Sequence, residues 1–180
     1  MITIIVGTNR KGSLTKVFAE KYHEILSKET DQEIQLLALE DLPHDWLLAN
    51  MYQGDDMPNN LKTIQEQYIL PASGFVVISP EYNGSFPGVL KLFIDACSVR
   101  KYIENFKGKK TAFIGTALGR AGNLRGMGHL ASIFNHLGAT TMPNQLPLSS
   151  IKTLMDENDQ VIDEDTIAAM TAHAKEFVAF

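Results

Sequence analysis

Gly-Thr-Asn-Arg-Lys-Gly-Ser-Leu-Thr, residues 7–15, is the stretch that decides the fold. Residues 1–6 before it are almost wholly apolar, and the segment after it carries apolar residues at helical spacing, at Leu14, Val17, Phe18, Ile25 and Leu26. The order is therefore strand, turn and helix. The first backbone N–H groups of a helix have no partners within it, and the helix dipole adds about half a positive charge at that end. This turn is therefore predicted to bind a phosphate.

The kind of phosphate loop can be narrowed by its glycines. Gly7 and Gly12 have the spacing of the G-x-x-x-x-G-K-[ST] nucleotide loop, but Ser13 occupies the lysine position, which argues against triphosphate chemistry. The dinucleotide fingerprint G-x-G-x-x-G is absent as well. A loop suited to one terminal phosphate remains, with Arg10 and Lys11 inside it. A turn with no ligand is the alternative for this stretch taken alone.

Length and composition limit the class of protein. The chain of 180 residues is predicted to form one domain, 1–180, and its formal net charge of −5 argues against a nucleic-acid partner. Its one cysteine, Cys97, excludes an internal disulfide and falls in an apolar helical series, so we expect a core residue and a reducing compartment. No apolar run approaches the roughly 20 residues of a membrane span, and no leader is apparent. We expect a cytoplasmic protein without a membrane partner.

Strands and helices alternate along the rest of the chain. Further strands are predicted at residues 33–39, 74–79, 110–116 and 139–142, and helices at 61–70, 87–100 and 167–178, with one more that follows the glycine-containing turn of residues 115–128 and ends at Gly138. This alternation predicts an α/β fold with a doubly wound parallel sheet. The longest connection, residues 43–60, is predicted to cover a ligand or a subunit interface, or to be a surface loop held by Trp46. Residues 143–165 read as a polar return whose acidic cluster is solvated.

Two more glycine-containing turns follow predicted strands. Residues 80–88 read Pro-Glu-Tyr-Asn-Gly-Ser-Phe-Pro-Gly, in which Asn-Gly is a strong turn signal. Residues 115–128 contain five glycines, with Arg120 and Arg125 between them. Ligands of open α/β sheets bind outside the carboxyl ends of the strands. The three turns are therefore predicted to form one site.

The first turn, the block of residues 80–91 and the following Ile94-Asp95 together resemble the NADPH-dependent FMN reductase family of flavodoxin-like proteins, and the resemblance extends along the whole chain. It implies five strands in the order 2-1-3-4-5 with helices on both faces, and bound FMN. It also implies an oxidoreductase that transfers hydride from NADPH or NADH through FMN to flavin, quinone or a similar small acceptor. A homodimer or homotetramer, with FMN near a subunit boundary, is implied too.

The resemblance assigns the site residues by position. The FMN phosphate would be held by Thr8, Arg10, Ser13 and Thr15. The edge of the isoalloxazine ring would be followed by Pro80, Glu81, Tyr82, Asn83 and Gly84, with Tyr82 either flanking the ring or packed at the base of its loop. The other side of the ring would be bounded by Ala117, Gly119 and Gly122. The reaction would take place at flavin N5, so neither a catalytic side chain nor a metal is expected.

Some features leave alternatives open. Leu92 stands where the family commonly has Asn. Arg120 or Arg125 would pair with the 2′-phosphate of NADPH or be a surface or interface residue, so the choice between NADPH and NADH stays open. The five histidines are expected to have ordinary surface or packing roles. A flavodoxin-type electron carrier and a non-catalytic binding module are the alternative functions.

Overall fold

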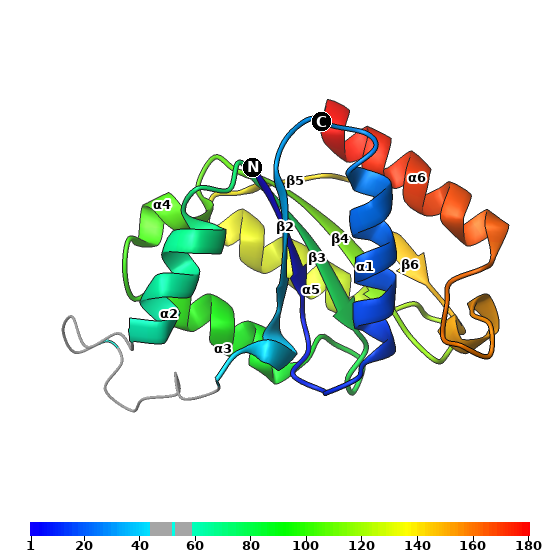
Figure 1. Ribbon diagram of the computed structural model, residues 1–180. Helices are drawn as coiled ribbons and strands as arrows, with labels where there is room; N and C mark the ends of the chain where they lie inside the picture. The colour runs from blue at the N-terminus through cyan, green and yellow to red at the C-terminus, as the bar shows by residue number, and fades with distance from the viewer. Residues whose placement is uncertain (44–51, 53–58) are drawn as a thin grey trace.

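A computed structural model describes residues 1–43, 52 and 59–180 (Figure 1). Its centre is a parallel sheet in the order β2-β1-β3-β4-β5, with a sixth short strand, β6, also paired to β4. The strands are β1 (Ile2–Val6), β2 (Ile34–Ala38), β3 (Gly74–Pro80), β4 (Lys110–Thr116), β5 (Thr140–Thr141) and β6 (Leu146–Leu148). The predicted fold class and strand order are confirmed.

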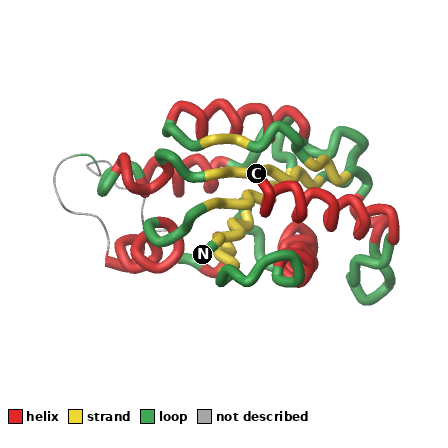
Figure 2. Tube along the Cα trace, turned by 90° about the horizontal axis from the view of Figure 1, so that it is seen from above, coloured by secondary structure: helices red, strands yellow, loops and turns green. Residues whose placement is uncertain are grey.

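Helices cover both faces of the sheet, as Figure 2 shows from above. One face packs on α1 (Leu14–Leu26) and α6 (Glu164–Ala179). The other packs on α2 (Asn59–Ile64), α3 (Gly88–Cys97), α4 (Tyr102–Phe106) and α5 (Leu124–His136). Every residue of β1 is buried, because a central parallel strand is covered on both faces and each side chain finds an apolar layer.

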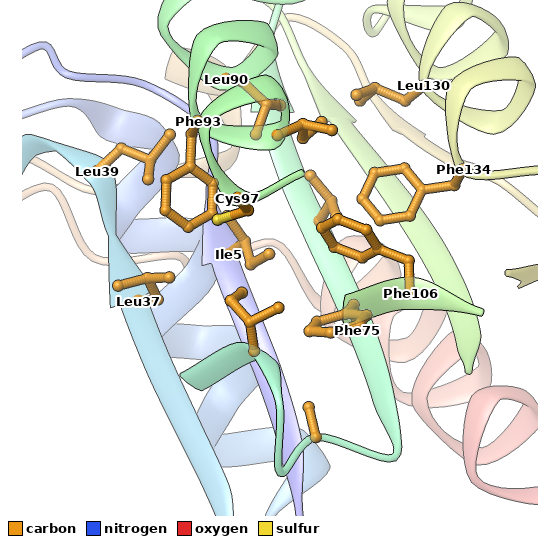
Figure 3. Close-up of a cluster of buried hydrophobic side chains, with 14 of the residues drawn as sticks. Ile5, Leu37, Leu39, Phe75, Leu90, Phe93, Cys97, Phe106, Leu130 and Phe134 are labelled. Carbon is orange, nitrogen blue, oxygen red and sulfur yellow. The ribbon is translucent and has the colours of Figure 1, made fainter. Parts of the chain in front are cut away.

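Aromatic rings fill the layer between the sheet and the helices α3, α4 and α5 (Figure 3). The ring centroid of Phe106 lies 5.6 Å from that of Phe75 and 5.3 Å from that of Phe134. The ring centroids of Phe134 and Phe113 are 5.5 Å apart. Tilted ring pairs at these distances are favourable beyond the area they bury. Cys97 lies in the same layer, fully buried, and burial raises the pKa of its thiol. Its predicted core role is confirmed.

The fifth strand differs from its prediction. Residues 139–142 were expected to form it, but β5 has two residues and pairs only with the start of β4, at Lys110 and Thr111. After Pro143 the chain returns to the same edge as β6, which pairs with residues 114–116 of β4. The edge strand is therefore in two pieces, separated by residues 142–145; Pro143, which has no N–H to donate to the ladder, lies in this gap. The expectation of an irregular return over residues 143–165 was wrong at β6.

The helix predicted to end near Arg100 ends at Cys97, and the short helix α4 follows it. Buried amide side chains bind the carbonyls at this end. Asn105 Nδ2 donates to the carbonyl oxygens of Cys97 and Arg100, at 2.8 and 3.0 Å, and Gln65 Nε2 donates to the same two at 2.9 and 2.8 Å. Gln65 itself begins a π-helical turn after α2. Sequence periodicity did not reveal these caps, because it reports apolar spacing and not polar side-chain bonds, and because Gln65 lies far from α3 in the chain.

The predicted covering loop, residues 43–60, lies almost entirely outside the described residues, so its role stays a prediction. Among the residues that are described, no helix has both the length and the apolar character that crossing a membrane would require.

A buried histidine joins α1 to α6. Tyr22 and His173 lie on these helices, with the Tyr22 hydroxyl 2.8 Å from His173 Nδ1, and His173 is 1 % exposed. Loss of hydration lowers the pKa of His173 to about 4, although Glu176 and the carbonyl of Asn144 oppose this shift. The neutral imidazole is therefore the form that the fold accepts.

We expect this pair to make stability fall with acid. Below the ordinary pKa of 6.5, His173 is protonated in the unfolded chain but stays neutral in the folded protein. The contribution of His173 to the free energy of unfolding is therefore complete above pH 6.5 and shrinks as the pH falls toward 4. At pH 5 the loss should be about 2 kcal/mol relative to pH 7.5. Urea unfolding of the wild type and His173→Asn, which keeps a partner for Tyr22, measures it. The two proteins should differ in their pH dependence, and parallel curves would contradict this origin.

Candidate functional site

The three predicted turns meet at the carboxyl edge of the sheet, where they enclose a cavity of about 370 Å³. The cavity receives most of the predicted site residues, namely Thr8, Arg10, Ser13, Thr15, Pro80, Glu81, Tyr82 and Ala117. The reason is the parallel pairing of β1, β3 and β4, which brings the ends of these strands to one edge. We call residues 7–13 the first loop, 80–87 the second loop and 117–123 the third loop.

The first loop presents backbone donors to the cavity. Helix α1 begins at Leu14, and Ser13 is its N-cap, accepting from the N–H of Lys16 at 3.4 Å. The N–H groups of residues 12–15 donate to no acceptor in the described part of the chain. Donors left in this way at the start of a thirteen-residue helix attract an anion.

Acidic residues after β2 neutralise two of the three cations near this loop. Lys16 Nζ lies 3.0 Å from Glu40 and 2.9 Å from Asp41, and Lys11 Nζ lies 3.6 Å from Asp41. The bond from Lys16, with the charge of Lys11 added, lowers the pKa of the Asp41 carboxyl. Arg10 is exposed and has no ion pair within the described ranges. Arg10 is therefore the cation of this loop that is free to meet a phosphate.

Hydroxyl groups connect the first loop to its neighbours. Thr8 Oγ1 lies 3.4 Å from the hydroxyl of Tyr82 in the second loop, and Thr15 Oγ1 lies 2.9 Å from Thr116 Oγ1 at the end of β4. Thr8, Thr15 and Thr116 are buried, whereas Tyr82 is 38 % exposed. The ring of Tyr82 thus lines the cavity while its hydroxyl reaches the base of the first loop. The Thr8–Tyr82 contact thus joins the first loop to the second, and the Thr15–Thr116 contact joins the first turn of α1 to the end of β4, just before the third loop.

The second loop ends in a tight turn. Tyr82 and Ser85 exchange two backbone hydrogen bonds, at 2.8 and 3.0 Å, and Asn83 and Gly84 between them have φ values of +51° and +77°. Two successive left-handed residues make a type I′ turn, which Asn-Gly favours, so the predicted turn is confirmed. Asn83 and Gly84 lie at its tip and do not line the cavity.

Helix α5 supports this tip. Ser85 Oγ lies 2.8 Å from His129 Nδ1, and a Cβ placed on Gly84 would lie 3.5 Å from Arg125 Nε. Arg125 therefore lies beside the second loop, and His129 has a specific partner that sequence spacing did not indicate.

In the third loop, Ala117 and Leu118 line the cavity, whereas Gly119 and Gly122 do not. Gly122 packs against β6, because a Cβ placed on it would lie 2.6 Å from the Cβ of Pro147. The carbonyl of Gly119 accepts from the N–H of Ser150 at 3.0 Å. Both glycines thus contact the segment around β6. Their contact with FMN, like that of Asn83 and Gly84, stays a prediction.

Sequence analysis missed one wall of the cavity. Ile151, Lys152 and Asp159 line it from the segment after β6. The missed signal is the apolar Leu-Pro-Leu of β6, because a parallel strand there places the residues that follow it at the same carboxyl edge as the three loops.

The residues present fit FMN. Its phosphate needs several donors and a cation, which the unpaired N–H groups of residues 12–15 and Arg10 provide at one end of the cavity. Its ring is planar and largely apolar, and Tyr82, Ala117 and Leu118 offer apolar surface at the other loops. A parallel sheet in this strand order, with a loop suited to phosphate after β1 and loops after β3 and β4 that line the same cavity, is typical of a flavodoxin-like protein.

Comparison with known proteins identifies the family. The profile of the NADPH-dependent FMN reductases matches residues 1–153. The chain is 29% identical over 167 residues to a 2-hydroxy-1,4-benzoquinone reductase from Burkholderia sp., covering 92% of this chain and 87% of that one. It is 30% identical over 183 aligned positions to a quinone reductase of Escherichia coli (strain K12), with 99% and 94% covered. The chain belongs to the NADPH-dependent FMN reductase family.

A solved structure agrees with this assignment. FerB, a flavoenzyme NAD(P)H:(acceptor) oxidoreductase from Paracoccus denitrificans, superposes with a TM-score of 0.74 at 28% identity, covering 99% of this chain and 94% of its own. The predicted family, the predicted class of FMN-dependent NAD(P)H oxidoreductase and the predicted cofactor are confirmed.

The charge distribution of the first loop predicts unequal roles for its two cations. Arg10→Ala should weaken FMN binding by about 1.5 to 3 kcal/mol, the size expected for a hydrogen bond to a charged group. Lys11→Ala is the matched control, because Lys11 is exposed and paired with Asp41, and it should change the affinity by no more than about threefold. Fluorescence titration of FMN into each apoprotein measures both constants. Equal losses in the two variants would refute the distinction.

Proposed function

We propose that this protein, as one domain over residues 1–180, holds FMN at the carboxyl edge of its sheet and passes hydride from NADPH or NADH to a small acceptor, with quinones as the leading class. The observation that carries the site is the set of unpaired N–H groups at residues 12–15 beside Arg10. The quinone class is supported by the printed activities of the Burkholderia and Escherichia coli relatives.

The first loop and the start of α1 bind the phosphate of FMN. The first loop takes the phosphate through the N–H groups, Arg10 and the hydroxyls of Ser13 and Thr15. Ser13 Oγ accepts from Lys16, so its own O–H is free to donate. The hydroxyl of Thr8 bonds Tyr82 and the N–H of Arg10, so Thr8 acts by holding the loop.

The second and third loops hold the ring. Pro80, Glu81 and Tyr82 line the cavity together with Ala117 and Leu118 of the neighbouring loop, and these residues orient the flavin and keep water from its faces. When bound, FMN supplies the acceptor for hydride at N5 and the donor for the second substrate. The Asn83–Gly84 tip has a left-handed backbone, which glycine adopts readily, and Ser85 next to it contacts His129 of α5, so the tip is held beside Tyr82 of the cavity.

We also propose a cytoplasmic homodimer or homotetramer. Leu118 is 63 % exposed, Leu124 53 % and Tyr82 38 %, and all three belong to the second or third loop or to the first residue of α5. Exposed apolar side chains grouped beside a site are typical of an interface. A second copy of the chain would cover them and close the mouth of the cavity.

Light scattering coupled to gel filtration tests the assembly. We expect a mass of two or four times 19.9 kDa, and Leu118→Glu together with Leu124→Glu should reduce it. Ile162→Glu, at another exposed apolar residue, is the control and should leave the mass unchanged. A mass of one chain over a range of protein concentrations would exclude the proposed oligomer.

Flavin reduction tests the reaction. Protein mixed with FMN should show a bound-flavin absorbance band that bleaches rapidly when NADPH or NADH is added without oxygen, and that returns when a benzoquinone follows. The faster of the two nucleotides gives the preference. Flavin that stays bound and coloured would indicate an electron carrier, and the absence of bound flavin would indicate a binding module. Free FMN mixed with the same nucleotide is the blank.

A further inference from the structure

We propose that Asn123 is a positioning residue that holds the second and third loops together and thereby sets the width of the slot for the flavin ring. The inference rests on the proposed FMN site. Asn123 is the N-cap residue of α5, is fully buried, and has a left-handed backbone with φ +60° and ψ +30°. It does not line the cavity, so it acts through the loops it joins.

The side chain of Asn123 reaches the start of the second loop. Its Nδ2 donates to the carbonyl oxygens of Ser79 and Pro80, both at 3.0 Å. These are the last two residues of β3, and the pairing of β3 with β4 ends at Pro80 and Thr116. Glu81 and Tyr82, which line the cavity, come next in the chain. The two bonds therefore fasten the third loop to the end of β3, immediately before the second-loop residues that line the cavity; the N–H of Glu81 also donates to the carbonyl of Thr116 there, at 2.9 Å.

The other end of the amide shows how tightly the residue is fitted. Two carbonyl acceptors require the NH₂ group on their side, so Oδ1 must face the first turn of α5, where it is buried without a hydrogen-bond partner. A Cβ placed on Gly126 would overlap Oδ1, and one placed on Gly115 would lie 2.9 Å from the Cβ of Asn123. An unpaired buried oxygen lowers stability, and each such case calls for a reason. The two bonds made by Nδ2 supply it.

This fit explains a glycine in α5. Glycine within a helix is unfavourable relative to alanine, yet Gly126 stands in the first turn of α5. Its lack of a side chain provides the space that Oδ1 occupies. Asn123 and Gly126 therefore form one unit, in which a side chain added at position 126 displaces the amide from β3.

The first test removes the amide. Asn123→Gly keeps a residue that adopts the left-handed backbone readily. We expect the Kd for FMN to rise about tenfold, as for two lost hydrogen bonds to backbone carbonyls. In the FMN-free protein, amide hydrogen exchange should accelerate over residues 81–85 and 117–122. This second readout does not depend on the cofactor.

A matched control separates positioning from stability. Asn105 is also fully buried, and its Nδ2 also donates to two carbonyls, at the far end of α3. Asn105→Ala should lower the melting temperature without changing the Kd for FMN or the exchange of the two loops. If Asn123→Gly and Asn105→Ala affect FMN binding equally for equal loss of stability, Asn123 is merely structural and the inference is wrong.

A double-mutant cycle tests the unit directly. Gly126→Ala alone should weaken FMN binding, because the added methyl group displaces Oδ1. In the Asn123→Gly background that oxygen is gone, so adding Gly126→Ala should have little further effect. Independent effects that simply add would overturn the inference. Should Asn123→Gly fail to fold, loop exchange and FMN binding of Gly126→Ala decide in its place.

Failure of the proposed function and failure of the inference about Asn123 give different results. If the wild type binds no FMN, the proposed function fails, while accelerated amide exchange of the two loops in Asn123→Gly still supports the positioning role of Asn123. If the wild type binds FMN and Asn123→Gly matches it in affinity and in loop exchange, the inference fails and the proposed function stands.

Discussion

The parallel pairing of β3 with β1 on one side and β4 on the other is the constraint on which the rest of the structure depends. It requires both faces of the central strands to be covered, which is why helices pack on each side of the sheet. It also places the ends of three strands at one edge, so loops separated by many residues share a cavity. Side chains then connect these segments where backbone pairing ends: Thr8 contacts the second loop, Asn123 of the third loop bonds the end of β3, and Thr15 of α1 contacts the end of β4.

The central strands and long helices followed from local pattern. The apolar runs of β1 and β3 and the helical period of α1 and α5 reflect burial that each segment carries in its own sequence. The ends and edges did not follow, because they depend on polar caps and strand partners that the apolar pattern of a segment does not show. Gln65 and Asn105 help to end α3 where periodicity continued, and β6 is a strand only because residues 114–116 of β4 are free to pair with it.

The candidate site was predictable to the same extent. The turns after β1 and β3 are short local motifs, so the presence of Arg10 and Ser13 at the cavity and the Asn83–Gly84 turn were predictable from residue type alone. The neutralisation of Lys11 by Asp41 was not, since it requires the end of β2 to lie beside the first loop. The same holds for Lys152 and Asp159, which reach the cavity through a strand that sequence analysis missed. Gly119 and Gly122 were chosen for access to a ligand, and the structure gives them contacts with the β6 segment.

The division of the outer strand at Pro143 also affects how the molecule behaves among its neighbours. An uninterrupted parallel edge would present a row of unpaired N–H and C=O groups, which is a template for strands of other chains. Here the row is cut into pieces of two and three residues, and Pro147 within the second piece has no N–H to offer. The same break that brings residues 151–159 to the cavity thus leaves little regular backbone for strand addition at this edge, whereas the opposite edge, β2, is an unbroken strand of five residues.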